Sequence, residues 1–274
     1  MEEFEIKDGV LIKYNGNDGD VVIPEFVSKI KDNSFDDHIE LKSISLSKNV
    51  KEFGTYVFCG CKNLERILVD DRNPYFQSID GVLFNKAGDE LICYPQNKSG
   101  EEYNIPSSVK TIGHASFRGC KNLKSIVFTN NVQEIGGYAF EYGSLEKVVI
   151  CNNVKKIFAG AFHGCENLTL LTLSNSIKAV GLWTFWHCNL RIVNIPDGVE
   201  SIGWRAFYDC DNLCSVVLPK TIKRISHLAF SQNLKEIYYR GTKKEWEKIS
   251  IDDDNDGLKN STIHFCWSEK TDID

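Results

Sequence analysis

The chain has 274 residues, of which 42% are hydrophobic and 26% charged, and its formal net charge is −6. This composition is ordinary for an ordered, soluble protein, and the negative charge disfavours nonspecific binding to nucleic acid or to an anionic membrane. No apolar run approaches the roughly 20 residues of a membrane-spanning helix, so we expect no membrane insertion.

The N-terminal sequence, MEEFE, is acidic and lacks the basic start and apolar core of a signal peptide. At face value this predicts a cytoplasmic protein. A secreted or cell-surface location is the alternative, if a signal peptide precedes the sequence given.

A repeat of 22–23 residues runs through almost the whole chain. It is marked by phenylalanine, at Phe35, Phe58, Phe117, Phe140, Phe162, Phe185, Phe207 and Phe230. Apolar residues precede each phenylalanine by five and eight positions, and a following leucine opens an alternating stretch, as in LKSIVF from Leu123. This alternation predicts a short strand with one buried face in each repeat. Because each unit needs only its neighbours to bury its apolar side, we predict a single solenoid domain, 1–274, with one continuous core.

The repeats are interrupted twice by similar sequences. Residues 1–23 contain Asp8-Gly9 between two apolar runs, which predicts a β-hairpin that caps the N-terminal end. Repeats then occupy 24–69. The long interval between Phe58 and Phe117 contains Asp80-Gly81 in the same setting. We therefore predict that 70–105 is a hairpin insertion that leaves the stack, and that repeats resume over 106–238.

Residues 239–274 depart from the repeat and are predicted to form a C-terminal cap, with Trp246 covering the open end of the core. Within the cap, the acidic run at 252–256 resembles the start of a calcium loop. The twelfth position counted from Asp252 is Ile263, where such a loop requires a bidentate glutamate. We interpret the run as a solvated loop, with adventitious calcium binding as the open alternative.

The ten cysteines favour a structural role. Five of them follow a repeat phenylalanine by three positions, namely Cys61, Cys120, Cys165, Cys188 and Cys210. A shared column predicts small, buried, apolar side chains. Zinc is not expected, because Cys59-x-Cys61 has no second pair at zinc-ligand spacing. Disulfides between repeats are geometrically conceivable but are not required by an even number of cysteines.

No catalytic motif stands out. The chain has no Gly-x-Ser-x-Gly, no phosphate-binding glycine loop and no His-Glu-x-x-His. Four histidines lie near the repeat phenylalanines at different offsets, which is typical of solvated turn residues. We therefore expect no catalytic residues, no metal site and no cofactor.

An aromatic cluster in two adjacent repeats is the first candidate binding site. It comprises Trp183, Trp186, His187, Trp204 and Tyr208. Trp186 and Tyr208 both follow a repeat phenylalanine directly, so we expect their rings to lie side by side. The cluster is interpreted either as a platform for a protein or sugar ligand or as padding at the edge between repeats.

The second candidate is an apolar row at outward positions of the predicted strands. Its members are Leu68, Val127, Val149, Leu170, Ile192, Val217 and Tyr238. We expect this row to line the concave face of the solenoid as a partner-binding surface. The alternative is that these residues reflect only the β-propensity of strands.

The repeat resembles that of the BspA-type leucine-rich repeat family. The resemblance rests on runs such as Ile202-Gly203-Trp204-Arg205-Ala206-Phe207-Tyr208-Asp209-Cys210-Asp211-Asn212-Leu213. The hairpin sequence at Ser78–Phe84 and the ending with Tyr239, Gly241, Thr242 and Trp246 also look like family elements. The resemblance implies a leucine-rich-repeat solenoid of the α/β horseshoe class, mostly β, in surface-exposed or secreted bacterial proteins that act in adhesion without enzymatic activity.

The leading functional hypothesis is therefore a noncatalytic protein-binding module in adhesion or host recognition. Two alternatives remain open: a carbohydrate-binding surface protein that uses the aromatic cluster, and a cytoplasmic scaffold with an intracellular partner. We expect a protein partner, with a glycan as the alternative ligand, no binding to nucleic acid, and a monomeric protein.

Overall fold

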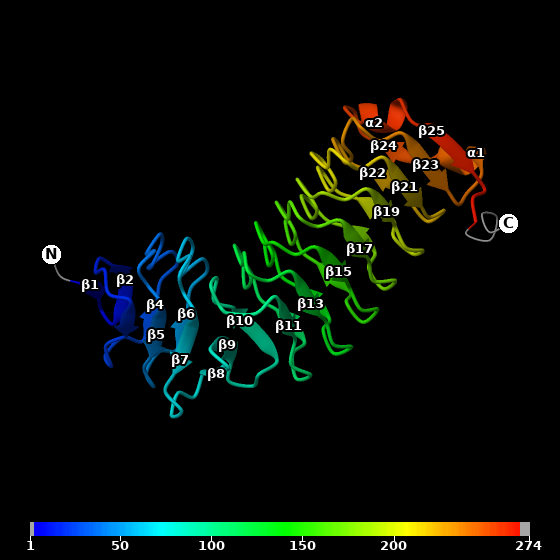
Figure 1. Ribbon diagram of the computed structural model, residues 1–274. Coiled ribbons are helices and arrows are strands. Elements are labelled where there is room, and N and C mark those ends of the chain that lie inside the picture. The colour runs from blue at the N-terminus through cyan, green and yellow to red at the C-terminus, as the bar shows by residue number, and fades with distance from the viewer. Residues whose placement is uncertain (1–2, 269–274) are drawn as a thin grey trace.

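The computed structural model describes residues 3–268 and confirms a solenoid of parallel strands (Figure 1). Each rung carries a longer strand, then a two-residue strand, then a tight turn that holds the repeat phenylalanine. The longer strands are β3 (Asp20–Val22), β5 (Ser43–Leu46), β7 (Arg66–Val69), β11 (Glu102–Asn104), β13 (Ser125–Val127), β15 (Lys147–Val149), β17 (Leu170–Thr172), β19 (Ile192–Asn194), β21 (Ser215–Leu218), β23 (Glu236–Tyr239) and β25 (Thr262–Phe265). The two-residue strands are β4 (Lys29–Ile30), β6 (Glu52–Phe53), β12 (Thr111–Ile112), β14 (Glu134–Ile135), β16 (Lys156–Ile157), β18 (Ala179–Val180), β20 (Ser201–Ile202), β22 (Arg224–Ile225) and β24 (Ser250–Ile251). Within the described part, helix is limited to α1 (Lys243–Trp246) and α2 (Asp256–Lys259) at the C-terminal end.

The repeat phenylalanines form a column of stacked rings in the core. Phe162 is fully buried, and its ring lies 5.0 Å from the ring of Phe140 and 5.3 Å from that of Phe185, nearly parallel to both. The stack continues through Phe207 to Phe230. Each rung therefore buries aromatic surface against its neighbours, which confirms the repeat register.

A regular set of backbone hydrogen bonds ties most of the tight turns to the next rung. In the Phe162 turn, the amides of Gly160, Phe162 and Gly164 donate to carbonyl oxygens of the following rung at 2.9, 2.9 and 2.8 Å. The residues two before and two after the phenylalanine have positive φ here and in the turns of Phe35, Phe58, Phe117, Phe140, Phe185 and Phe207. The three N–H groups of each turn therefore point to the same side.

The N-terminal hairpin is confirmed, and it leads directly into a rung. β1 (Phe4–Lys7) pairs antiparallel with β2 (Val10–Tyr14), which pairs in parallel with β4, while β3 pairs in parallel with β5. Tyr14 takes the place of the repeat phenylalanine, because its ring stacks on Phe35 at 5.0 Å and its amide donates to the carbonyl of Ser34.

The prediction that 70–105 leaves the stack is wrong for its second half. β8 (Phe76–Ile79) and β9 (Val82–Asn85) form the predicted hairpin. β10 (Glu90–Cys93), however, pairs antiparallel with β9 and in parallel with β12, and β11 pairs in parallel with β13. The segment from Glu90 to Asn104 is therefore a rung, and Tyr94 stacks on Phe117 at 4.9 Å in place of a phenylalanine.

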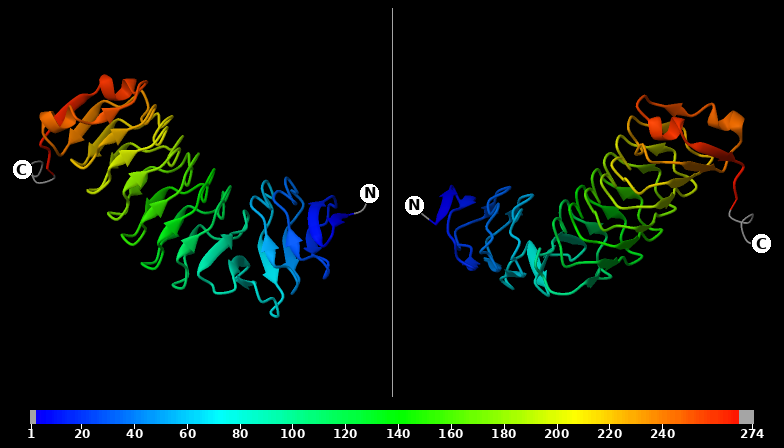
Figure 2. Two further views of the ribbon diagram at one scale, coloured as in Figure 1. Left: turned by 180° about the vertical axis from the view of Figure 1, so that it is seen from behind. Right: turned by 45° about the horizontal axis from the view of Figure 1, so that its top comes forward.

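The prediction of one continuous core is also wrong. The buried apolar residues form two clusters that meet at β9, where Leu83 belongs to the N-terminal cluster, and Val82 and Phe84 belong to the C-terminal one. Side chains of a strand alternate between its two faces, so this antiparallel strand separates the cores and supplies both. The molecule bends at this point (Figures 1 and 2). The tight turns, rather than the longer strands, line the inner side of the bend, which corrects the expected concave face.

The C-terminal segment continues both sheets before it closes the core. β24 pairs with β22, and β25 pairs with β23. The predicted plug, Trp246, is partly buried and packs against Tyr239 at 5.3 Å. Ile249 and Leu258 are more deeply buried, so closure of the core is shared among several side chains.

The cysteine column is buried, as predicted, and all its members are free thiols. Each thiol points at the preceding rung; Cys165, for example, donates to the carbonyl of Phe140 at 3.1 Å. Burial raises the pKa of Cys165 to about 12 and that of Cys188 well above its ordinary value. Both thiols are thus held in the protonated, unreactive form.

We expect a thiol reagent to leave Cys165 and Cys188 unmodified in the native protein, while the exposed Cys266 reacts readily. Mass spectrometry of peptides labelled without denaturant measures this difference. Rapid native labelling of Cys165 and Cys188 would show that the column is accessible and would contradict its placement in the core.

Candidate functional site

Five members of the predicted apolar row are exposed on the outer side of the longer strands, here called the long-strand face. Leu68, Val127, Val149, Leu170 and Ile192 are 42%, 45%, 47%, 59% and 60% exposed. The last four lie on β13, β15, β17 and β19, which are consecutive longer strands. The alternate side chains of these strands point into the core, so the outward ones are not needed for packing within the solenoid.

The row is neither complete nor a single line. Val217 occupies an outward position, next to Asn194 and Tyr238, but it is only 6% exposed, so it adds no exposed surface to the row. It pairs with Tyr238, which is half-buried and lies under the rings of His264 and Trp267 at 4.8 and 5.6 Å. Aromatic side chains of the C-terminal end thus cover this part of the face.

The strand register divides the exposed residues into two neighbouring lines. Leu170 stands opposite Lys147, whereas Val149 stands opposite Thr172. On the line that contains Val149, the next residue is Thr172. On the other line, Lys147 is followed by Leu170, so the exposed apolar side chain changes lines between β15 and β17. The exposed aliphatic groups consequently form a patch across β13–β19, with a diagonal step at β17. We call Val127, Val149, Leu170 and Ile192 the apolar patch.

The structure brings the predicted aromatic cluster together on two adjacent tight turns. The ring of Trp183 lies 5.3 Å from that of Trp204 and 6.2 Å from that of Trp186. Trp204 is 37% exposed and His187 is exposed, whereas Trp183, Trp186 and Tyr208 are half-buried. The cluster is therefore partly a surface feature and partly packing between rungs.

Arg205 holds the cluster together, and the sequence analysis missed it. Its guanidinium carbon lies 5.7 Å from the ring centre of Trp186, 4.9 Å from that of Trp204 and 5.3 Å from that of Tyr208. The contact expected between Trp186 and Tyr208 is thus replaced by a cation that packs on both rings. Only its place two residues before Phe207, among aromatic neighbours, signals this role in the sequence.

Trp186 also belongs to a ladder of side chains that runs along the tight turns. Its ring stacks on His163 at 4.6 Å, and the imidazole Nδ1 of His163 lies 3.0 Å from the carboxylate of Glu141, which also accepts from Arg118. Burial alone would raise the pKa of Glu141, but its hydrogen bonds with His163 and Arg118 hold that pKa below its ordinary value. Trp186 is therefore tied into the structure. Trp204 and His187 are the exposed members of the cluster, and His187 lies 3.6 Å from Glu166 and 3.4 Å from Asp209.

The acidic run at 252–256 has structural partners. Asp252 pairs with Arg224 at 2.9 Å, Asp254 lies 3.6 Å from His227, and the buried Asn255 accepts a hydrogen bond from the amide of Ala229. These groups face different partners rather than one centre. Across residues 3–268, no group of three or more potential ligands is placed to hold a metal ion, and no helix has the length and apolar character to cross a membrane.

A family model described as the BspA type leucine rich repeat region, in six copies, matches residues 13–88, 92–191 and 133–254. No curated protein matches the chain. Among solved structures, a leucine-rich repeat protein from Eubacterium ventriosum is 28% identical, with a TM-score of 0.73 over 91% of this chain and 72% of that one. A leucine rich cell surface protein from Faecalibacterium prausnitzii is 25% identical, with a TM-score of 0.61 over 85% of this chain and 62% of that one. The pneumococcal vaccine antigen PcpA, 23% identical with a TM-score of 0.59 over 90% of this chain and 67% of that one, shares the fold.

Proposed function

The chain belongs to the BspA-type leucine-rich repeat family, and from that premise we propose that it is a noncatalytic module that binds a protein partner through its long-strand face. Leucine-rich repeat proteins generally act in protein interaction or surface recognition. We further propose adhesion or host recognition as its setting, which is supported by the similarity to a leucine rich cell surface protein from Faecalibacterium prausnitzii.

The apolar patch is the observation that carries this proposal. It places four large aliphatic side chains, 45–60% exposed, on adjacent strands of one face. Contiguous exposed apolar surface is uncommon on a protein without a partner, and a flat parallel sheet presents it without rearrangement. The charged neighbour Lys147, opposite Leu170, supplies the polar rim that interfaces usually have.

We expect the double substitution Val149→Lys and Leu170→Lys to abolish partner binding without loss of stability, because both side chains point outward. Affinity capture with quantitative mass spectrometry compares this variant with the wild type. The amount of a specific partner captured by the variant should fall by about tenfold or more relative to the wild type, because an apolar contact buried in the interface is replaced by an unpaired charge.

The matched control carries Gln133→Lys and Gln232→Lys, which add the same charge at exposed positions outside the long-strand face. It should capture the partner as the wild type does. Equal recovery with all three proteins would place binding elsewhere and remove the support for this face.

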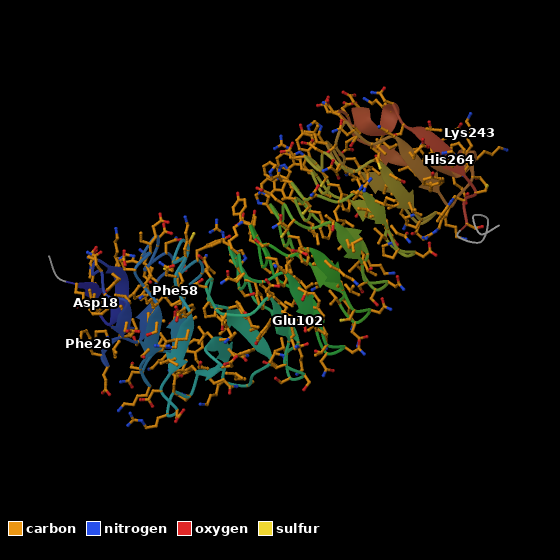
Figure 3. The ribbon with its side chains drawn as sticks, viewed as in Figure 1. Asp18, Phe26, Phe58, Glu102, Lys243 and His264 are labelled. Carbon is orange, nitrogen blue, oxygen red and sulfur yellow. The ribbon has the colours of Figure 1, made fainter. Side chains whose placement is uncertain are left out.

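A carbohydrate ligand is the second candidate, and the exposed ring of Trp204 favours it. If sugars stack on that ring, Trp204→Ala should remove binding to a glycan array while lowering the melting temperature by only a few degrees. Phe26→Ala is the control, because Phe26 is an exposed ring on the N-terminal part, away from the cluster (Figure 3). Unchanged glycan signals with Trp204→Ala, or no signal with the wild type, would count against this candidate.

A further inference from the structure

The hydrogen-bond ladder between tight turns has one internal break, at the Phe58 turn. The turns of Phe35, Phe117, Phe140, Phe162 and Phe185 each donate three amides to the following rung. At the Phe58 turn, the corresponding amides are those of Tyr56, Phe58 and Gly60. None of the three has a hydrogen-bond partner among the residues that the structure describes. Phe58 is buried, so its amide is poorly placed to bond to bulk water.

The break arises because the next rung has no projecting turn. In that rung Tyr94 is followed by Pro95, and the amide of Tyr94 makes the one backbone bond to the Phe117 turn, at 2.7 Å to Ser116. The Phe58 and Phe117 turns therefore face each other across a gap on the inner side of the bend. Side-chain contacts bridge it: Tyr56 packs edge-on against His114 at 5.1 Å, Arg118 Nη1 lies 2.7 Å from the thiol of Cys59, and the Arg118 guanidinium packs on the ring of Tyr56.

Beneath these contacts is a pocket of about 320 Å³, at the lower end of the sizes usual for small-molecule sites. Its walls are largely apolar and come from both cores, with Phe53, Phe58, Phe76, Ile92 and Tyr94 among them. The two cores meet at this place and leave the pocket unfilled, because the antiparallel strand β9 takes the position of a regular rung between them.

The polar groups of the residues that line the pocket include backbone amides, a guanidinium and a carboxyl group. The free amides of Tyr56 and Phe58 belong to residues that line the pocket, and because they alternate along the turn they can donate to different oxygens of one ligand. The guanidinium carbon of Arg118 lies 5.6 Å from the ring centre of Tyr56. Glu90 also lines the pocket, and burial raises the pKa of its carboxyl group.

We propose that this pocket binds a small carboxylic acid with an apolar body. The carboxylate accepts hydrogen bonds from the amides of Tyr56 and Phe58, and the apolar body lies among the rings and Ile92. The positive charge of Arg118 attracts the carboxylate through space, while the hydrogen bonds of its guanidinium go to Glu141 and Cys59. A neutral ligand of the same shape would satisfy the amides less well, because hydrogen bonds to a charged acceptor are stronger.

The test uses 3-phenylpropionate as the probe and 3-phenylpropanol as its neutral counterpart. We expect the acid to bind the wild-type chain at least about tenfold more tightly than the alcohol. Titration followed by amide NMR should shift the signals of Tyr56 and Phe58 more than those of the Phe162 turn. Equal affinities, no binding of the acid, or shifts confined to other turns would each overturn the proposal.

Ile92→Trp fills the pocket and should remove acid binding. Ile192→Trp, the same change on the long-strand face, should leave it intact. Retained binding by a folded Ile92→Trp protein would contradict the assigned pocket. If Ile92→Trp does not fold, the comparison of acid with alcohol on the wild type still decides the question.

Discussion

Replacing Phe162 with alanine is expected to lower the free energy of unfolding by about 3–5 kcal/mol, the range for emptying a buried aromatic site. Phe162 is fully buried, and its ring is stacked between those of Phe140 and Phe185. The substitution therefore removes contacts to two neighbouring rungs at once, and the surrounding turns are held by backbone hydrogen bonds that resist collapse into the cavity. Urea denaturation followed by circular dichroism measures the loss.

Phe158 provides the control, because it lies in the same rung and its ring is exposed. Phe158→Ala should change the free energy of unfolding by less than about 1 kcal/mol, as is usual for surface substitutions. A loss below about 1 kcal/mol for Phe162→Ala would mean that the column of stacked rings does not hold the rungs together.

Leu83→Asp is expected to have a still larger effect, because it places a carboxylate in the joint between the two cores. Leu83 is fully buried on β9, and its neighbours Val82 and Phe84 belong to the other core. An unpaired buried charge costs several kcal/mol and exceeds what most single substitutions remove. We expect a loss above about 4 kcal/mol, or failure of the N-terminal part to fold.

Ile79→Asp tests whether this effect depends on burial, since Ile79 is an exposed residue of the same hairpin. It should leave the unfolding transition nearly unchanged. If Leu83→Asp behaved in the same way, the hairpin would not join the cores, and the original prediction of an excursion from the stack would be restored for β8–β9.

The sequence predicted the repeat, the cysteine column and both hairpins because each depends on residue type at a fixed step. It did not reveal the rungs of Tyr14 and Tyr94, although each tyrosine lies about one repeat before a phenylalanine, at Phe35 and Phe117. A search for phenylalanine alone overlooks a tyrosine that can make the same stack. The division of the core was not predicted either, because the segment with Tyr94 was expected to be an insertion outside the stack.

The candidate sites were predicted less completely, for physical reasons. Alternation along a strand shows which side chains point outward, but not what covers them. The burial of the outward Val217 beside Tyr238 could therefore not be predicted. The gathering of rings around Arg205 depends on contacts between rungs, which spacing within a repeat does not describe. The pocket depends on amides left without acceptors where a turn is missing beside Pro95, and no residue type marks such a gap.

The central claim, that the long-strand face binds a protein partner, is tested most directly by photo-crosslinking from that face. A benzophenone amino acid placed at Leu170 should crosslink to a partner protein, and an excess of unlabelled wild-type chain should suppress the product. The same group at Gln133, exposed outside the long-strand face, should give none. Crosslinks from Gln133 but not from Leu170 would contradict the claim and place the binding surface elsewhere on the solenoid.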